Sequence, residues 1–216
     1  MHQSKKKHLV TFDLGGVVVQ VARSIDDAAN RAGLCLSDPS SSVEHSKLSA
    51  LHDMWQVGTI ADEDFFEEWA GAHGNRFSPR DAAAISASYL IGQYEGLEEI
   101  TDQLLSQGIA LGCLSNTCNH HWKVMHGDSK RFPSVKSFEY PHASHLWGVM
   151  KPQDRIYELY EEATGYGAEQ IVFFDDLAEN VEAATRRGWK AYRILPDREP
   201  SMQIREALRG LAIGDF

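Results

Sequence analysis

The chain has 216 residues, 43% of them hydrophobic, so it can bury a substantial core and suits one main domain with an insertion. Its 31 acidic and 21 basic side chains give a formal net charge of −10 at pH 7, which argues against a nucleic acid or an anionic membrane as partner. The three cysteines (Cys35, Cys113 and Cys118) show no metal-ligand spacing and no even disulfide framework, and no apolar stretch is long enough to span a bilayer. We therefore expect reduced thiols in a cytoplasmic protein.

The first predicted element is a buried parallel strand at Leu9–Phe12, because such strands favour an uninterrupted apolar run. Asp13 closes this run, and a carboxylate at that position is costly to bury unless it meets water, a partner or a metal. Gly15 and Gly16 follow, and they allow the backbone to turn sharply and to approach a ligand closely.

A long helical stretch is predicted after this strand. Helices are expected at about 25–33, 43–56, 62–73 and 79–89, with glycine or proline between the last three. Trp55 and Trp69 lie on two of them and are expected to be core residues. Because the stretch is too long for a simple crossover, we predict a helical insertion at residues 21–91. Residues 1–20 and 92–216 would form the main domain.

From Leu97 to Ile194 the sequence alternates between helix and strand, which predicts an α/β fold with a parallel, Rossmann-like sheet. The strand that starts at Ile109 ends in Ser115 and Asn116. A last helix is expected near residues 201–209.

Two further polar motifs belong to this region. The strand that starts at Ile171 ends in the paired carboxylates Asp175 and Asp176. Between the two strands, Lys151 directly precedes Pro152, which we expect to begin a helix.

These polar residues are expected to meet, because the ligand crevice of an open parallel sheet lies outside the carboxyl ends of its strands. Three carboxylates, a hydroxyl and a lysine at that edge indicate a divalent cation beside a phosphate. The carboxylates would hold the cation, and the lysine would hold the anion.

The four motifs together resemble the haloacid dehalogenase-like (HAD) hydrolase superfamily, most of whose members are magnesium-dependent phosphatases. They read Phe-Asp-Leu-Gly-Gly-Val, Leu-Ser-Asn-Thr, Lys-Pro-x-x-x-Ile-Tyr and Phe-Phe-Asp-Asp-x-x-x-Asn. In detail they look most like the subgroup that includes bacterial α-glucose-1-phosphate phosphatase. The resemblance extends from Asp13 to about Ile194, and it implies that the helical insertion is a cap on a Rossmann-like core.

The resemblance also implies roles for individual residues. Asp13 matches the nucleophile, which forms an aspartyl-phosphate. Ser115 matches the hydroxyl that binds the phosphoryl oxygens, a role that Asn116 would share. Lys151 matches the lysine that neutralises the charge of nucleophile and phosphate.

The implied cofactor is Mg²⁺. Its ligands would be Asp13, the backbone carbonyl of Gly15 and the acidic pair Asp175 and Asp176, of which the second usually touches the metal.

Gly15 is the one departure from the pattern of the superfamily. Most of its phosphatases have a second aspartate at this position, which protonates the leaving alcohol and then activates water. Such general acid–base catalysis contributes a factor of about 10²–10⁴. We therefore expect a substrate with a comparatively acidic leaving group, such as the anomeric hydroxyl of a sugar 1-phosphate. Alternatively, a residue of the cap or a bound water replaces the aspartate, or the protein turns its substrate over slowly.

These observations predict a magnesium-dependent phosphatase that acts on a small phosphorylated metabolite, a sugar phosphate being one example, as a monomer or homodimer. Two other functions stay open. One is a 2-haloacid dehalogenase on the same fold, although that branch carries serines where this chain has Asp175 and Asp176. The other is a catalytically weak phosphate-binding relative, which the glycine at position 15 would explain.

Overall fold

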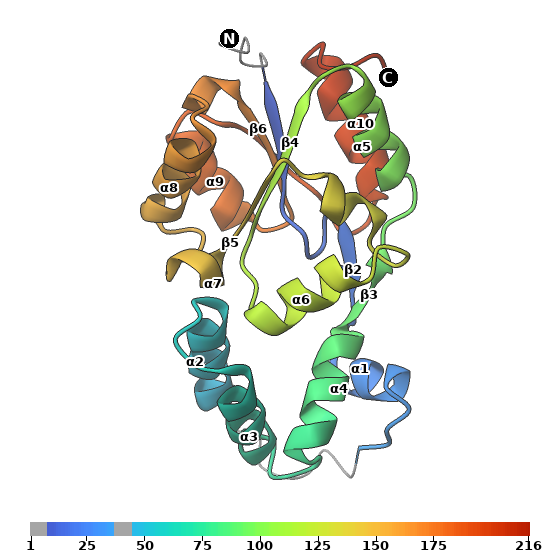
Figure 1. Ribbon diagram of the computed structural model, residues 1–216, viewed down its shortest axis with the longest axis vertical. Helices are drawn as coiled ribbons and strands as arrows, with labels where there is room; N and C mark the ends of the chain where they lie inside the picture. The colour runs from blue at the N-terminus through green and yellow to red at the C-terminus, as the bar shows by residue number, and fades with distance from the viewer. Residues whose placement is uncertain (1–7, 37–44) are drawn as a thin grey trace.

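The computed structural model describes residues 8–36 and 45–216 (Figure 1). Within them, a five-stranded parallel sheet has the order β5–β4–β1–β6–β7. The strands are β1 (Leu9–Phe12), β4 (Ala110–Ser115), β5 (Tyr140–Ala143), β6 (Ile171–Asp175) and β7 (Lys190–Arg193). The predicted α/β class with a Rossmann-like parallel sheet is confirmed.

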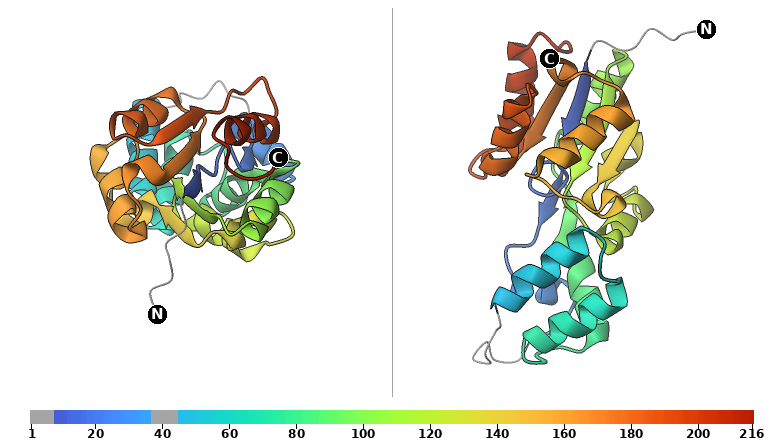
Figure 2. Two further views of the ribbon diagram at one scale, coloured as in Figure 1. Left: turned by 90° about the horizontal axis from the view of Figure 1, so that it is seen from above. Right: turned by 90° about the vertical axis from the view of Figure 1, so that its left-hand side faces the viewer.

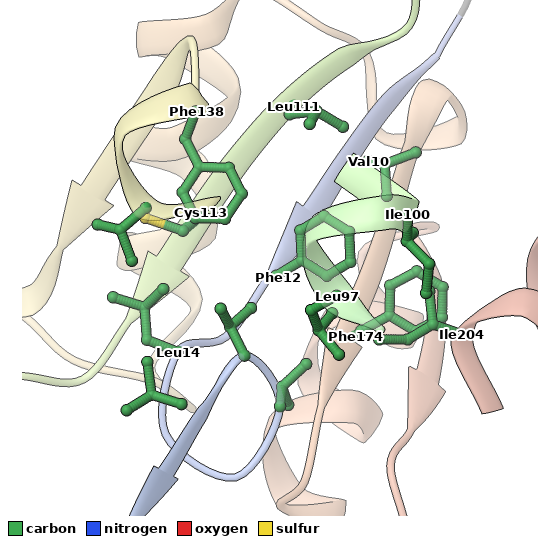
Figure 3. Packing of buried hydrophobic residues seen from close by; sticks show 14 of the residues in the cluster. Val10, Phe12, Leu14, Leu97, Ile100, Leu111, Cys113, Phe138, Phe174 and Ile204 are labelled. Atoms are coloured by element: carbon green, nitrogen blue, oxygen red, sulfur yellow. The ribbon is translucent and has the colours of Figure 1, made fainter. Parts of the chain in front are cut away.

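The three central strands are buried on both faces, which explains their continuous apolar sequences. Side chains alternate between the faces, so Val10 and Phe12 belong to one hydrophobic cluster and Leu9 belongs to another. Phe12 lies between Phe138 and Phe174, with ring centroids 5.9 and 5.6 Å away (Figure 3). This packing fixes the end of β1, where the chain continues into Asp13.

Helices cover both faces of the sheet (Figure 2). Apolar residues of α5 (Leu97–Ser106) and α10 (Pro200–Gly210) pack in the cluster of Phe12, whereas those of α8 (Asp154–Thr164) and α9 (Ala178–Arg186) pack in the cluster of Leu9. The other helical elements of this part are α6 (Asn119–Gly127), α7 (Ser144–Trp147) and the 3₁₀ turns Pro133–Ser137 and Ala168–Gln170. The helix predicted near 201–209 is α10.

Four helices lie together beyond the carboxyl edge of the sheet (Figure 1). They are α1 (Ile25–Arg31), α2 (His45–Gln56), α3 (Asp62–Ala72) and α4 (Pro79–Tyr89). The predicted helix at 43–56 is described from His45 on, and residues 43 and 44 lie outside the described residues. These helices share their own hydrophobic cluster, in which Trp55 and Trp69 are both buried, as predicted.

A two-stranded antiparallel ribbon connects these helices to the main sheet. It consists of β2 (Val19–Val21) and β3 (Leu90–Gln93), and the sequence analysis did not predict it. The predicted boundaries after residues 20 and 91 fall inside these two strands. The division into a core and a cap at these positions stays a prediction.

The three cysteines are free thiols, as expected. Cys113 and Cys118 are buried, and burial raises the pKa of each to about 12, which makes them poor nucleophiles. Among the described residues, no helix has the length and apolar character needed to cross a membrane.

Candidate active site

Neighbouring strands of the sheet bring polar side chains to one edge. In the register of the sheet, Phe12 of β1 lies beside Cys113 of β4 and Phe174 of β6. Asp13 continues the ladder, because its backbone N–H donates to the carbonyl of Phe174 at 2.8 Å. Ser115 ends β4, and its side chain lies close enough to the Asp13 carboxylate to lower the pKa of Asp13. Asp13 and Ser115 therefore meet where the sequence predicted.

The buried ammonium group of Lys151 joins the ends of three strands. Its Nζ donates to the carbonyl oxygen of Leu114 at 2.7 Å and to Asp175 Oδ2 at 2.6 Å, and it lies 3.1 Å from Asp13 Oδ1. Its three N–H bonds thus have three acceptors. Burial lowers the pKa of Lys151, but the carboxylates of Asp13 and Asp175 outweigh burial and raise the pKa above its ordinary value. Lys151 is therefore cationic at neutral pH.

Asn116 fixes the backbone of Lys151 on both sides. Its Nδ2 donates to the Lys151 carbonyl at 2.8 Å, and its Oδ1 accepts from the Lys151 N–H at 2.9 Å. These bonds hold residues 151–153 in a turn, and α8 begins only at Asp154. The predicted helix start at Pro152 is therefore wrong. The side chain of Asn116 positions the lysine that lies beside Asp13.

Asp175 is fully buried and surrounded by donors. Besides Lys151, its oxygens accept from the backbone N–H of Leu177 at 2.9 Å and from Asn180 Nδ2 at 3.0 and 3.1 Å. Asn180 is buried in the first turn of α9, and the sequence analysis gave it no role although it is part of the last motif. The available signal was an asparagine one helical turn after the acidic pair. Asn180 holds Asp175, which in turn holds Lys151.

The electrostatics of the site favour a cation. Burial raises the pKa of Asp13 to about 7; Lys151 opposes this shift, and Asp175 and Asp176 add to it. Burial and the neighbouring Asp175 also raise the pKa of Asp176. Three carboxylates with one ammonium group leave a local excess of negative charge, which a bound cation would relieve.

The same carboxylates fit a magnesium ion. Each of Asp13, Asp175 and Asp176 offers one oxygen, and these oxygens lie within 4.8 Å of one another. In the described part of the chain, no other group of three His, Cys, Asp or Glu side chains gathers in this way. Carboxylate oxygens are the ligands that Mg²⁺ prefers. Of the three, Asp175 has both oxygens engaged by N–H donors, which favours Asp13 and Asp176 as direct ligands.

The two glycines after Asp13 differ in the space around them. Gly16 has a φ of +74°, and a Cβ there would lie 2.5 Å from Asp176 Oδ2, so this position requires glycine. A Cβ at Gly15 would meet only Val21 Cγ1, at 3.8 Å, which is an ordinary contact. The absence of a side chain at Gly15 is therefore not imposed by packing.

The fold is that of known HAD enzymes. A HAD family enzyme from Bacteroides thetaiotaomicron superposes with a TM-score of 0.77, at 21% identity over 93% of this chain and 100% of that one. The chain has the HAD fold. The Bacteroides enzyme has also been solved with magnesium and inorganic phosphate, and that structure superposes with a TM-score of 0.72 at 20% identity, over 88% of this chain and 96% of that one.

The HAD fold also serves other chemistry. The L-2-haloacid dehalogenase of Xanthobacter autotrophicus, solved with chloropropionic acid covalently bound, superposes with a TM-score of 0.64, at 21% identity over 98% of this chain and 85% of that one. These low identities establish the fold alone.

Sequence comparison gives a shorter match. A 52-residue segment is 38% identical to a phosphatase of Mycobacterium tuberculosis, and it represents 24% of this chain and 24% of that protein. The chain thus matches about a quarter of the length of this curated relative. No protein-family model matches the chain.

Proposed function

We propose that this protein is a magnesium-dependent phosphatase that hydrolyses a small phosphomonoester through an aspartyl-phosphate on Asp13. The observation that carries the proposal is the buried Lys151 ammonium group, which lies 3.1 Å from Asp13 Oδ1 beside a cluster of three carboxylates. An anionic nucleophile can attack an anionic phosphate only where cations offset their repulsion. This site holds one cation permanently and has the ligands for a second.

In the first step, Asp13 attacks the phosphorus atom of the ester. The backbone N–H of Leu14 donates to Oδ1 at 2.7 Å, and Lys151 contacts the same oxygen, so the carboxylate is held in one orientation. We assign the attack to the other oxygen, Oδ2. As the new P–O bond forms, the bond between phosphorus and the ester oxygen breaks. Lys151 and Ser115 stabilise the negative charge on the phosphoryl oxygens.

In the second step, water attacks the phosphorus atom of the aspartyl-phosphate. The bond between phosphorus and Asp13 breaks, which releases inorganic phosphate and restores the carboxylate. Because Gly15 provides no acid, the leaving oxygen of the first step takes its proton from water. This route is fast only for a leaving group that is stable as an anion.

A magnesium ion fits beside this machinery. Asp13 and Asp176 would hold it, together with the carbonyl oxygen of Gly15, while Asp175 keeps Lys151 in place. When bound, Mg²⁺ supplies positive charge that stabilises the ionised nucleophile and the phosphoryl oxygens.

The direct test measures phosphate release from sugar 1-phosphates, sugar 6-phosphates, an aryl phosphate and alkyl phosphates, with and without magnesium. We expect turnover that requires magnesium and that disappears in Asp13→Asn. Asp154→Asn is the matched control, because Asp154 is exposed at the start of α8 and lies outside the site. Turnover that persists in Asp13→Asn would refute the proposed nucleophile.

The dehalogenase alternative has its own test. A haloacid dehalogenase has the same fold. Because a haloacid carries no phosphate, its attack by an aspartate needs no metal ion to neutralise phosphate charge. Chloride release from 2-chloropropionate without magnesium, in a protein that leaves every phosphate ester intact, would favour the dehalogenase. The three clustered carboxylates favour the phosphatase.

A further inference from the structure

A cavity of about 200 Å³ lies between helices α2, α3 and α4 and the segment that follows β4. Aromatic rings from all three helices line it, namely those of Trp55, Phe65, Trp69 and Tyr89. Trp55 and Phe65 stack with their ring centroids 3.8 Å apart, which forms a rigid wall. An apolar cavity of about 150 Å³ is large enough for benzene, so this one has room for a single substituted ring.

The cavity borders the candidate active site at Asn116. This residue lines the cavity, and its side-chain amide is hydrogen-bonded to the backbone of Lys151. The preceding residue, Ser115, contacts Asp13. Asn116 thus lies both on the wall of the cavity and against Lys151, which places the cavity next to the groups that would hold the phosphate.

The lining of the cavity carries no formal charge, and it combines the four aromatic rings with polar side chains that include Gln56, Ser86 and Thr117. Among the described residues that line it, none has a carboxylate, ammonium or guanidinium group. Trp55 Nε1 donates to Asp62 at 2.8 Å, and His121 Nε2 lies 3.0 Å from both Ser86 oxygens. Burial lowers the pKa of His121 to about 4, so its ring is neutral at pH 7. An aromatic ring would pack against the four rings and needs no hydrogen-bond partner, whereas each hydroxyl group of a sugar would need one to replace its water.

The glycine at position 15 restricts the same part of the substrate, its leaving group, for an independent reason. Without an acid at this position, the ester oxygen must leave as an anion. A phenol has a pKa of about 10, far below that of an alkyl alcohol, so a phenolate leaves without prior protonation. The cavity selects an aromatic ring, and Gly15 requires an acidic leaving group; a phenol satisfies both.

We propose that the substrate is an aryl phosphate monoester whose single ring lies in the cavity lined by Trp55, Phe65, Trp69 and Tyr89. This inference rests on the proposed phosphatase function and names its substrate class. It differs from the sugar 1-phosphate that the sequence suggested, because the four lining rings favour an aromatic ring over a sugar.

The first experiment measures binding without turnover. Phenyl phosphate and glucose 1-phosphate are titrated into the magnesium-loaded Asp13→Asn protein by calorimetry. We expect phenyl phosphate to bind at least about tenfold more tightly, as is typical when an apolar pocket discriminates between ligands. Equal or tighter binding of glucose 1-phosphate would overturn the inference.

Variants of a lining residue test whether the preference for phenyl phosphate over glucose 1-phosphate depends on the cavity. Tyr89 is half-buried, so Tyr89→Ala removes a lining ring with limited damage to the core. We expect it to reduce the preference for phenyl phosphate by about tenfold, and Tyr89→Phe to preserve it. Met54→Ala is the control, because Met54 is on α2 but 44% exposed. A preference unchanged in Tyr89→Ala would overturn the assignment of the ring to this cavity.

Steady-state kinetics of the unmodified protein provide a measurement that depends on no variant. Phenyl phosphate should have the highest kcat/KM among phenyl phosphate, cyclohexyl phosphate and glucose 1-phosphate, and phenol should inhibit more strongly than cyclohexanol. Magnesium-dependent turnover of glucose 1-phosphate above that of phenyl phosphate would refute the aryl substrate and leave the phosphatase intact. No turnover of any ester would refute both proposals.

Discussion

An aspartate introduced at Gly15 would place a carboxylate two residues after Asp13, on the turn that leaves the sheet. The structure has room for it, because a Cβ there would meet only Val21 Cγ1, at 3.8 Å. Gly15 also lies outside the left-handed region of φ, so the substitution introduces no backbone strain. We therefore expect Gly15→Asp to fold and to test directly what the missing acid does.

The expected effect depends on the leaving group. General acid catalysis is worth about 10²–10⁴, which corresponds to about 3–5 kcal/mol of activation free energy. Benzyl phosphate has an aromatic ring but an alkyl leaving group, so Gly15→Asp should raise its kcat/KM by about 100-fold. Phenyl phosphate, whose phenolate leaves unprotonated, should gain little. The added charge would alter magnesium or phosphate binding equally for both esters. The ratio of the two changes in kcat/KM therefore isolates the effect on the leaving group.

The assay compares kcat/KM for the two esters at saturating magnesium. Gly15→Asn is the matched control, because it has nearly the same size without an ionisable proton, and it should not rescue benzyl phosphate. Equal changes in kcat/KM for both esters, or equal kcat/KM values for Gly15→Asp and Gly15→Asn, would refute the idea that position 15 lacks a general acid. Gly16→Asp should give no increase in kcat/KM for either ester, because the added Cβ would lie 2.5 Å from Asp176 Oδ2 at a φ of +74° and would distort the site.

Three further substitutions test the electrostatics and packing of the site. The folded-state pKa of Asp13, about 7, exceeds the ordinary value of 3.8, so its contribution to stability falls as pH rises through this range. Asp13→Asn should therefore stabilise the magnesium-free protein by up to about 4 kcal/mol near pH 8 and by much less near pH 4, measured by urea denaturation in EDTA; equal effects at both pH values would contradict this. Lys151→Met leaves Asp13 facing Asp175 without a cation and should cost about 3–5 kcal/mol in the same assay; a stable variant would show that the carboxylates do not need Lys151 for folding. In Gly112→Ala, the added Cβ would lie 2.2 Å from the Tyr160 hydroxyl, so the melting temperature should fall by an amount equivalent to about 1–3 kcal/mol, and an unchanged value would show that α8 can shift.

The sheet and its polar edge could be predicted, because the first depends on local apolar runs and the second on the general geometry of parallel strands. A continuous apolar run predicts a strand buried on two faces, and β1, β4 and β6 are such strands. The residues after those strands must then share one edge, whatever the details of packing. The convergence of Asp13, Ser115 and Asp175 therefore follows from the order of the motifs.

Short elements that depend on distant partners could not be predicted in this way. β3 follows α4 without a break, and its pairing with β2 is set by residues some seventy positions earlier in the chain. The turn at Pro152 is similar, because the Asn116 side chain, 35 residues away, holds the backbone of Lys151. Proline alone is compatible with the first turn of a helix, and the contact with Asn116 could not be read from the local sequence.

The aromatic cavity is a further feature that the sequence did not predict. Trp55 and Trp69 lie on predicted helices and are expected to be core residues, and both are buried. Spacing does not tell whether the rings of three helices fill that core or leave a space of about 200 Å³ between them, because the space depends on how the helices pack. Gly15, by contrast, can be read directly from the sequence, and under the proposed mechanism it restricts the leaving group. The sequence therefore underlies the expectation of an acidic leaving group, and the packing of α2, α3 and α4 underlies the proposal that this group carries an aromatic ring.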